Sequence, residues 1–178
     1  MNQKRKIVLF IATSLDGYIA TKNNSLDWLF DVEGDGDNGF SAFYQTVDTI
    51  LMGRRTYDWI MNQELDSFPY EGKACYVFTQ SVVNDTKYVK FINEDMTDFL
   101  DRLKSRSGKN IWIAGGGGLI NSIIKTKQVD EIILTIAPTI LGGGISLFRE
   151  GDYHLNLELK QMKRYNQFAE LYYMVKDV

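Results

Sequence analysis

Two glycine-bearing turns, each between an apolar run and a helical pattern, are the features of this sequence best suited to chemistry. The first is Gly115-Gly116-Gly117-Gly118, which leads from the apolar residues 111–114 into a helical stripe that starts at Leu119. Such a turn lets backbone N–H groups approach a pyrophosphate, and the helix amino terminus adds positive potential. The same glycines can also mark a plain tight crossover, and their spacing is not that of a Rossmann fingerprint.

A second turn has the same position after a strand but carries charge. The apolar residues 49–52 are followed by Gly53, Arg54, Arg55 and Thr56, and then by Tyr57, Ile60 and Met61 at helical spacing. Guanidinium groups at a helix start suit bidentate phosphate contacts, and a threonine hydroxyl adds a donor. Solvated surface arginines would give the same local pattern. Because ligands of open α/β sheets gather at the carboxyl ends of the strands, the two turns together predict a dinucleotide site.

Three polar or aromatic residues outside these turns are further candidates, each with a competing explanation. Thr79 follows a third apolar run and could contact an adenosine ribose or its 2′-phosphate, although an ordinary polar turn also explains it. Asp16 could contact a substrate hydroxyl or stabilise its own turn, and Trp28 could stack on a flat ring or pack in the core. His154 is the only histidine and lies far from both turns in sequence, so no metal site is expected.

The order of apolar runs predicts the sheet that must hold these residues. Short continuous runs bounded by polar or glycine turns indicate buried strands at residues 7–12, 49–52, 74–78, 111–114 and 132–136. Helical spacing appears around residues 96–103, behind a possible cap at Asp95, and around 119–124. The tail offers two strand-like segments, 155–162 and 168–175. We therefore predict an α/β fold with a mostly parallel central sheet, antiparallel carboxyl-terminal strands and flanking helices.

Length, charge and composition restrict the class of protein. With 178 residues and 44% hydrophobic content, residues 1–178 suit one domain with a substantial core. A net charge of −3 gives no basic surface for nucleic acid. No signal peptide and no apolar stretch of about 20 residues is present, which predicts a cytoplasmic protein without a membrane span.

Two further features of the sequence are local. The only cysteine, Cys75, suits a buried inert thiol. The glycine-rich acidic residues 31–39 predict an exposed loop before a helix near 40–47.

Taken together, five segments resemble the dihydrofolate-reductase-like family. This family includes the carboxyl-terminal reductase domain of the bifunctional riboflavin-biosynthesis deaminase-reductase, and its stand-alone bacterial members are the most similar. The segments occur in register through nearly the whole chain: SLDGYIA at 14–20, ILMGRRTY at 50–57, YVFT at 76–79, IAGGG at 113–117 and APTILGG at 137–143.

This resemblance implies a cofactor and a set of contacts for it. The cofactor is NADPH, which would give a hydride to a C=N or C=O bond of a small heterocycle or sugar amine. Four residues would lie along its nicotinamide half: Ala12, Gly17, Tyr18 and Ile19. The remaining ones would hold the phosphates and adenosine: Gly53, Arg54, Arg55, Thr56, Thr79, Gly115, Gly116, Gly117, Gly118 and Leu119. Gln80 stands where relatives often have an arginine, which bears on the choice between NADPH and NADH.

Two departures from the family bear on the substrate. Riboflavin-pathway reductases carry a glutamate just before the glycine run, and this chain has Ala114 there, which disfavours that pathway. Folate reductases place a carboxylate on the first helix to help protonate the substrate. The candidate for this catalytic role is Asp37, although a solvated place in the acidic loop explains Asp37 as well.

The sequence thus predicts an NADPH-dependent oxidoreductase of small organic substrates. One alternative is a reductase of folate or of the riboflavin precursor 5-amino-6-(5-phosphoribosylamino)uracil. An alternative of another class is a nucleotide-binding protein without turnover. A homodimer is expected, because relatives pair through their sheets and the tail is apolar and aromatic at Phe168, Leu171, Tyr172 and Tyr173.

Overall fold

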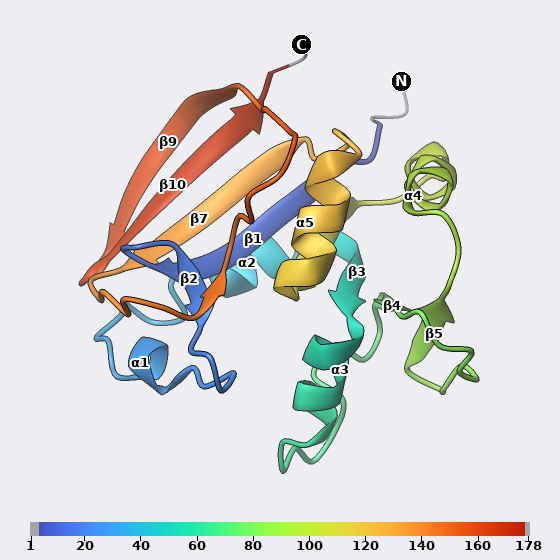
Figure 1. Ribbon diagram of the computed structural model, residues 1–178, viewed down its shortest axis with the longest axis horizontal. Helices are drawn as coiled ribbons and strands as arrows, with labels where there is room; N and C mark the ends of the chain where they lie inside the picture. The colour runs from blue at the N-terminus through green and yellow to red at the C-terminus, as the bar shows by residue number, and fades with distance from the viewer. Residues whose placement is uncertain (1–3, 177–178) are drawn as a thin grey trace.

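The computed structural model describes residues 4–176, which form one large sheet, a two-stranded sheet and five helices (Figure 1). The strands are β1 (Ile7–Ser14), β2 (Tyr18–Ala20), β3 (Val47–Gly53), β4 (Ala74–Phe78), β5 (Val89–Ile92), β6 (Asn110–Gly115), β7 (Glu131–Ala137), β8 (Ile145–Ser146), β9 (Leu157–Tyr165) and β10 (Phe168–Val175). The helices are α1 (Asp27–Phe30), α2 (Phe40–Tyr44), α3 (Arg54–Met61), α4 (Met96–Ser105) and α5 (Gly117–Lys125). None of the helices in the described residues is long and apolar enough to cross a membrane.

The large sheet has the strand order β5-β4-β3-β6-β1-β7-β10-β9. The six strands from β5 to β7 are parallel to one another, and β10 pairs antiparallel with both β7 and β9. This confirms the predicted α/β fold with a mostly parallel sheet and antiparallel carboxyl-terminal strands. The parallel strands are buried on both faces, which explains why they occur in the sequence as continuous apolar runs.

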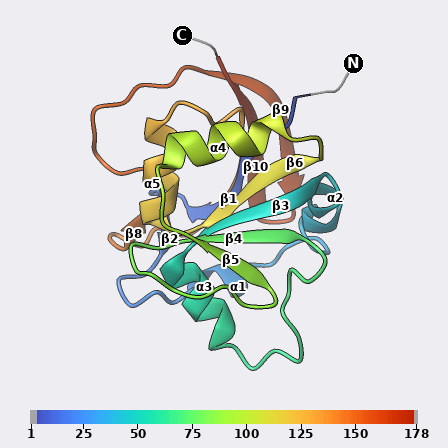
Figure 2. The same cartoon turned by 90° about the vertical axis from the view of Figure 1, so that its right-hand side faces the viewer.

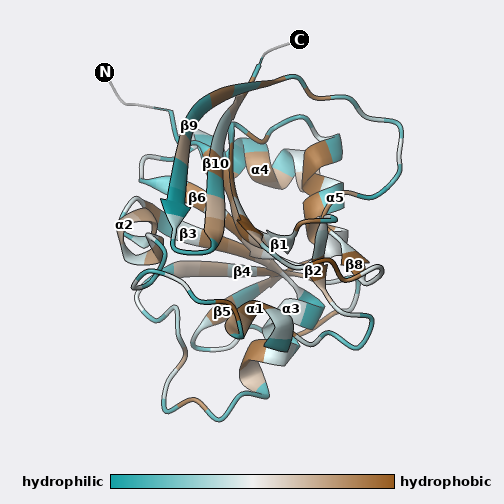
Figure 3. Cartoon of the chain, turned by 90° about the vertical axis from the view of Figure 1, so that its left-hand side faces the viewer, coloured by the Kyte–Doolittle hydropathy of each residue, from teal (hydrophilic) through white to brown (hydrophobic). Residues whose placement is uncertain are grey.

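Helices α4 and α5 cover one face of the sheet, and their apolar residues join those of β1, β3, β6 and β7 in a single core cluster. α5 contributes Leu119, Ile120, Ile123 and Ile124, all at most 6% exposed, and is coloured as largely apolar in Figure 3. α4 begins where the sequence predicts, because the Asp95 side chain accepts a hydrogen bond from the Asp98 N–H.

The opposite face is covered by α2, α3 and the segment 62–73, and α2 and α5 lie on either side of the strands in Figure 2. An aromatic cluster fills this side around Trp112 of β6, whose indole N–H donates to the Phe10 carbonyl at 3.0 Å. Its members are Phe10, Phe40, Phe43, Tyr44, Tyr70 and Trp112. Cys75 is buried on the same face, where burial raises the pKa of its thiol to about 12, which agrees with an inert cysteine.

Candidate functional site

The carboxyl ends of the parallel strands form one edge of the sheet, and both glycine turns lie on it. β3 ends at Gly53 and runs directly into α3 (Figure 1), and β6 ends at Gly115 just before α5. β3 and β6 are neighbours in the sheet, with Met52 paired to Gly115. The two turns predicted to bind phosphates are therefore adjacent in space.

The two turns approach each other most closely at Gly116, where an added side chain would crowd its neighbours. A Cβ on Gly116 would lie 3.2 Å from the Thr56 Oγ1 and 3.5 Å from the backbone nitrogen of Gly53. Gly116 also has a φ of +98°, in the region that residues with a Cβ rarely adopt. A Cβ on Gly53 would in turn lie 3.7 Å from the Cβ of Leu119. The glycines allow the amino termini of α3 and α5 to approach each other.

Both helix amino termini present backbone N–H groups that no side chain caps. Neither Gly53, before α3, nor Gly116, before α5, provides a capping hydrogen bond, and neither helix has an acidic residue in its first turn. α4 differs, because Asp95 caps it. Uncapped first-turn amides retain their hydrogen-bonding capacity and positive potential, so this edge suits a pair of phosphates. The sequence placed the second helix at Leu119, but α5 begins at Gly117, so Gly117 and Gly118 belong to its first turn.

The two arginines of the first turn differ in their contacts. Arg54 donates from Nε to the Asp58 carboxylate at 2.7 Å, one helical turn later, and its guanidinium lies 5.5 Å from the centre of the Phe91 ring. Arg55 is exposed and makes no ion pair within residues 4–176. Thr79 comes directly after Phe78, which pairs with Gly53, so this threonine lies at the same edge as the arginines.

The turn after β1 is joined to the start of α5 through the small sheet. Gly17 has a φ of +87°, and its carbonyl accepts the Leu147 N–H at 2.9 Å. Tyr18 in β2 pairs with Ser146 in β8. The Ser146 carbonyl in turn lies 3.2 Å from where a Cβ on Gly117 would be. Ile19 packs against the apolar cluster on the α5 side, and Ala12 precedes the turn on β1. The structure thus brings the residues assigned to the two halves of a dinucleotide to one edge.

Arg149 is a further cation at this edge that the sequence analysis missed. One of its terminal guanidinium nitrogens, Nη2, lies 3.6 Å from the position of a Cβ on Gly117, at the start of α5. No hydrogen bond or ion pair engages this guanidinium among the described residues. No sequence motif marks Arg149, which follows β8. Its position at this edge depends on the pairing of β8 with β2, which the sequence does not indicate.

Asp16 and Trp28 both lie near the carboxyl end of β1 in sequence, but their surroundings differ. The Asp16 carboxylate accepts from the Ser14 hydroxyl and from the Leu141 and Gly142 N–H groups, at 2.7–3.1 Å. The Ser14 hydroxyl, aided by these two amides, lowers the pKa of Asp16. Asp16 therefore links its own turn to the segment after β7 through hydrogen bonds. Trp28 lies on α1, and its indole N–H is sealed from solvent without a hydrogen-bond partner among the described residues.

Asp37 is exposed in the loop before α2 and binds backbone N–H groups of that loop. Its exposed carboxylate accepts N–H groups from Gly39 at 3.0 Å and from Ser41 at 2.8 Å. Hydrogen bonds from Ser41 lower its pKa, whereas a general acid near neutral pH needs a raised pKa. Asp37 organises the loop that leads into α2, and the catalytic role expected for it stays a prediction.

The protein-family comparison assigns this architecture. A model of the RibD C-terminal domain matches residues 5–169, which include both glycine turns and β1 to β9. The chain belongs to the RibD C-terminal domain family. The resemblance to the dihydrofolate-reductase-like reductases is thus confirmed at the level of family.

Individual relatives of this RibD C-terminal domain protein agree with that assignment. The uncharacterized protein YwjB of Bacillus subtilis (strain 168) is 48% identical, over 96% of this chain and 98% of the relative. A crystal structure from Shewanella sp. PV-4, provisionally assigned to riboflavin biosynthesis, has a TM-score of 0.88 at 31% identity and covers 97% and 99% of the two chains. Enterococcus faecalis dihydrofolate reductase, solved with NADP(H) and RAB-propyl, has a TM-score of 0.65 at 15% identity and covers 98% of both chains, which shows the shared fold.

Proposed function

We propose that this protein is an NADPH-dependent reductase of a small heterocyclic or sugar-amine substrate. The observation that carries the proposal is the direct contact between two uncapped helix amino termini, at Gly53 and Gly116, with Thr56 between them. Membership of a reductase-domain family supports it, as does the NADP(H) bound to the Enterococcus faecalis relative of the same fold.

The residues at this edge fit the phosphates of a dinucleotide. The first-turn amides of α3 and α5 would hold the pyrophosphate, and Arg55 and Arg149 would add charge without first breaking an ion pair. Arg54 would have to leave Asp58 to bind a phosphate, which reduces its net contribution. Thr79 would contact the adenosine ribose or its 2′-phosphate.

The same arrangement would place the redox half of the cofactor near Ala12 and the Gly17–Ile19 turn. NADPH supplies a hydride when bound, so the protein needs to align the substrate and keep water away. Asp16 would hold the turn in place through its bonds to Leu141 and Gly142. The Trp28 side chain on α1 would stack on a flat ring of the substrate. A role in riboflavin synthesis is not proposed, because Ala114 provides no carboxylate before the glycine turn.

A calorimetric titration of the purified protein with NADPH and with NADH tests the proposal. We expect NADPH to bind, and the Arg54→Ala/Arg55→Ala double variant to bind it roughly tenfold or more weakly, because at least one charge-assisted hydrogen bond to phosphate is lost. If an arginine contacts the 2′-phosphate, which NADH lacks, the double variant should lose less affinity for NADH than for NADPH. Failure of the wild-type protein to bind either nucleotide would refute the reductase proposal.

We also propose that the protein forms a homodimer through the β9–β10 hairpin. β9 is an edge strand that exposes Leu157, Leu159 and Met162 by 39%, 46% and 69%. All three lie on the same face, because they pair with Val175, Tyr173 and Leu171. Light scattering should give twice the chain mass of 20.4 kDa, and Leu159→Lys with Met162→Lys should give the monomer. A wild-type mass of one chain would contradict this proposal.

A further inference from the structure

A cavity of about 800 Å³ lies at the amino-terminal edge of the sheet, opposite the proposed cofactor site. Its lining comes from the residues before β1, the end of α4, the loop before β6 and the turn after α5. In Figure 1 the start of β1 and the end of α5 meet at the upper side of the molecule, whereas α3 begins at the lower side. Sites for small molecules usually measure about 300–1,000 Å³, so the cavity has room for a ligand of its own.

The lining of this cavity is polar throughout. It contains no apolar or aromatic side chain among the described residues, and its neutral members are Ser105, Ser107, Gly108 and Gln128. Pockets that bind ring systems are lined mainly by hydrophobic and aromatic side chains, and nucleotide bases stack on aromatic rings. The cavity therefore suits a strongly polar ligand without a ring system.

The charge of the lining is positive in a protein that is negative as a whole. Four cations and two carboxylates line the cavity, whereas the net charge of the chain is −3. One of the cations, Lys104, is already engaged, because its Nζ donates to the Asp130 carboxylate at 2.7 Å. The other three make no ion pair within residues 4–176: Lys4, Arg106 and Lys127. The lining therefore attracts anions and offers them three unengaged cations.

The helix ends nearby do not account for these cations. Arg106 follows α4 and Lys127 follows α5, and cations at a helix carboxyl terminus often bind its last carbonyls. Here the Ser105 and Thr126 hydroxyls bind carbonyls of the last turns, at 2.8 and 2.6 Å. Neither Arg106 nor Lys127 donates a side-chain hydrogen bond to a carbonyl within the described part of the chain.

The loop between α4 and β6 adds backbone donors to the same cavity. The N–H groups of Ser107 and Gly108, which both line it, make no hydrogen bond within residues 4–176. The next N–H, that of Lys109, donates to the Asp48 carboxylate at 2.8 Å, and the Arg5 guanidinium balances the charge of Asp48. Successive backbone N–H groups in a turn are typical of anion sites. The loop thus combines unpaired amides with a fixed neighbour.

We propose that this cavity is a second ligand site, which binds a small diphosphate through the Ser107 and Gly108 N–H groups and the side chains of Lys4, Arg106 and Lys127. Charge-assisted hydrogen bonds from cations and amides to phosphate oxygens supply the affinity, and three separate cations match two phosphate groups. A diphosphate occurs free and as part of nucleotides, and the polar lining favours the free form. This site is independent of the proposed reductase function.

Amide chemical shifts of the ¹⁵N-labelled protein during titration with pyrophosphate test the site. We expect saturable changes at residues 105–109 and 127–128. Pyrophosphate bound at the cofactor edge would instead change residues 53–56 and 115–119, so the two sites are read separately. Absence of changes at residues 105–109 at millimolar pyrophosphate would overturn the proposal, whatever happens at the cofactor edge.

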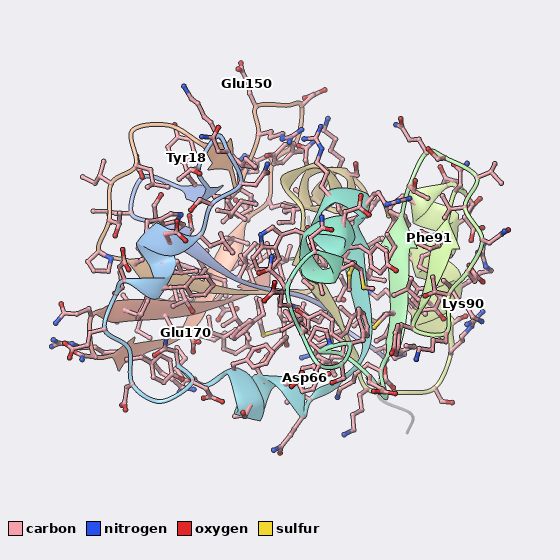
Figure 4. All side chains as sticks on the ribbon, turned by 90° about the horizontal axis from the view of Figure 1, so that it is seen from below. Tyr18, Asp66, Lys90, Phe91, Glu150 and Glu170 are labelled. Carbon is pink, nitrogen blue, oxygen red and sulfur yellow. The ribbon has the colours of Figure 1, made fainter. Side chains whose placement is uncertain are left out.

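Two double variants of equal net charge show whether the cavity cations hold the ligand. Arg106→Gln with Lys127→Gln removes two cavity cations, and Lys87→Gln with Lys90→Gln removes two exposed cations elsewhere. Lys90 lies at the rim of the molecule beside β5 in Figure 4. The cavity variant should bind pyrophosphate at least about tenfold more weakly, and the other variant should bind it like wild type. Equal affinity in the two variants would overturn the assignment.

Inorganic phosphate and ADP define the ligand further. Phosphate has one phosphate group and should bind more weakly than pyrophosphate, because it engages fewer of the donors. ADP should change residues 105–109 no more tightly than pyrophosphate, because no aromatic side chain in the lining stacks on the adenine. Phosphate binding as tight as that of pyrophosphate, or much tighter binding of ADP, would contradict a site for a free diphosphate.

Discussion

Alanine in place of Gly116 is expected to weaken NADPH binding at least about a hundredfold. The added Cβ would lie 3.2 Å from the Thr56 Oγ1 and 3.5 Å from the Gly53 nitrogen, at a φ of +98° that alanine adopts only with strain. Relief of this contact and of the strained φ requires the Thr56 side chain to turn away and the start of α5 to shift relative to Gly53. Two charge-assisted bonds from amides to phosphate, each worth about 1.5–3 kcal/mol, would then be lost. Calorimetric titration with NADPH measures the change.

Gly118→Ala is the matched control for this variant. Gly118 lies two residues later, in the first turn of α5, where a Cβ would meet nothing within 4 Å and φ is not positive. Alanine there removes no amide and adds no contact between the two turns, so it should weaken NADPH binding far less than Gly116→Ala, and it should add up to about 1 kcal/mol of stability through its better helix propensity. Thermal melting of both variants shows that the fold persists at the titration temperature. Wild-type affinity in Gly116→Ala would contradict the contact between the turns as the basis of binding.

The second large effect is expected in the core rather than at the site. Trp112→Ala should lower the free energy of unfolding by about 3–5 kcal/mol, the usual range for truncation of a buried large aromatic residue. Trp112 is 5% exposed at the centre of the aromatic cluster, and its N–H bonds the Phe10 carbonyl, which would lose this partner. Chemical denaturation followed by circular dichroism measures the loss.

Trp59→Ala provides the comparison for Trp112→Ala. Trp59 lies on α3 and is 38% exposed, so its truncation should cost less than about 1 kcal/mol. A loss of similar size in the two variants would show that the cluster around Trp112 does not organise the α2 face of the sheet. A loss below about 1 kcal/mol in Trp112→Ala would also show that this cluster does not organise the α2 face of the sheet.

The parts of the fold that the sequence predicts are those with a strong local signal. β4 occupies the predicted residues 74–78, and the strands at β1, β3, β6 and β7 each contain the predicted apolar run. These strands are buried on both faces, so their apolar character is continuous and easy to recognise. α4 carries both a helical stripe and a capping aspartate, Asp95, and its start is accordingly well predicted.

The parts that were missed depend on tertiary contacts. β5 contains Lys90 between apolar residues and joins the sheet only as the edge partner of β4. β2 and β8 are three and two residues long, and they approach closely because Gly144 has no side chain to collide with the Ala20 carbonyl. Such short strands carry too few residues for a periodic pattern.

The candidate site shows the same division between local and long-range information. The glycine turns and their arginines are local motifs, so the sequence indicates them. Arg149 has no motif, and the pairing of β8 with β2 gives it its place. Asp37 was selected for its distance along the chain, whereas its surroundings depend on Ser41 and the loop geometry.

The position of the cofactor is tested most directly by amide chemical shifts of the ¹⁵N-labelled protein during titration with NADPH. The proposed function predicts that the largest changes fall on Gly53–Thr56, Gly115–Leu119 and Gly17–Ile19, all at the carboxyl edge of the sheet. The opposite edge has a cavity of about 800 Å³ lined in part by Lys104, Arg106 and Lys127, whose charges could also attract phosphates. Changes confined to that cavity would contradict the proposed site, and no changes at all would contradict NADPH as the cofactor.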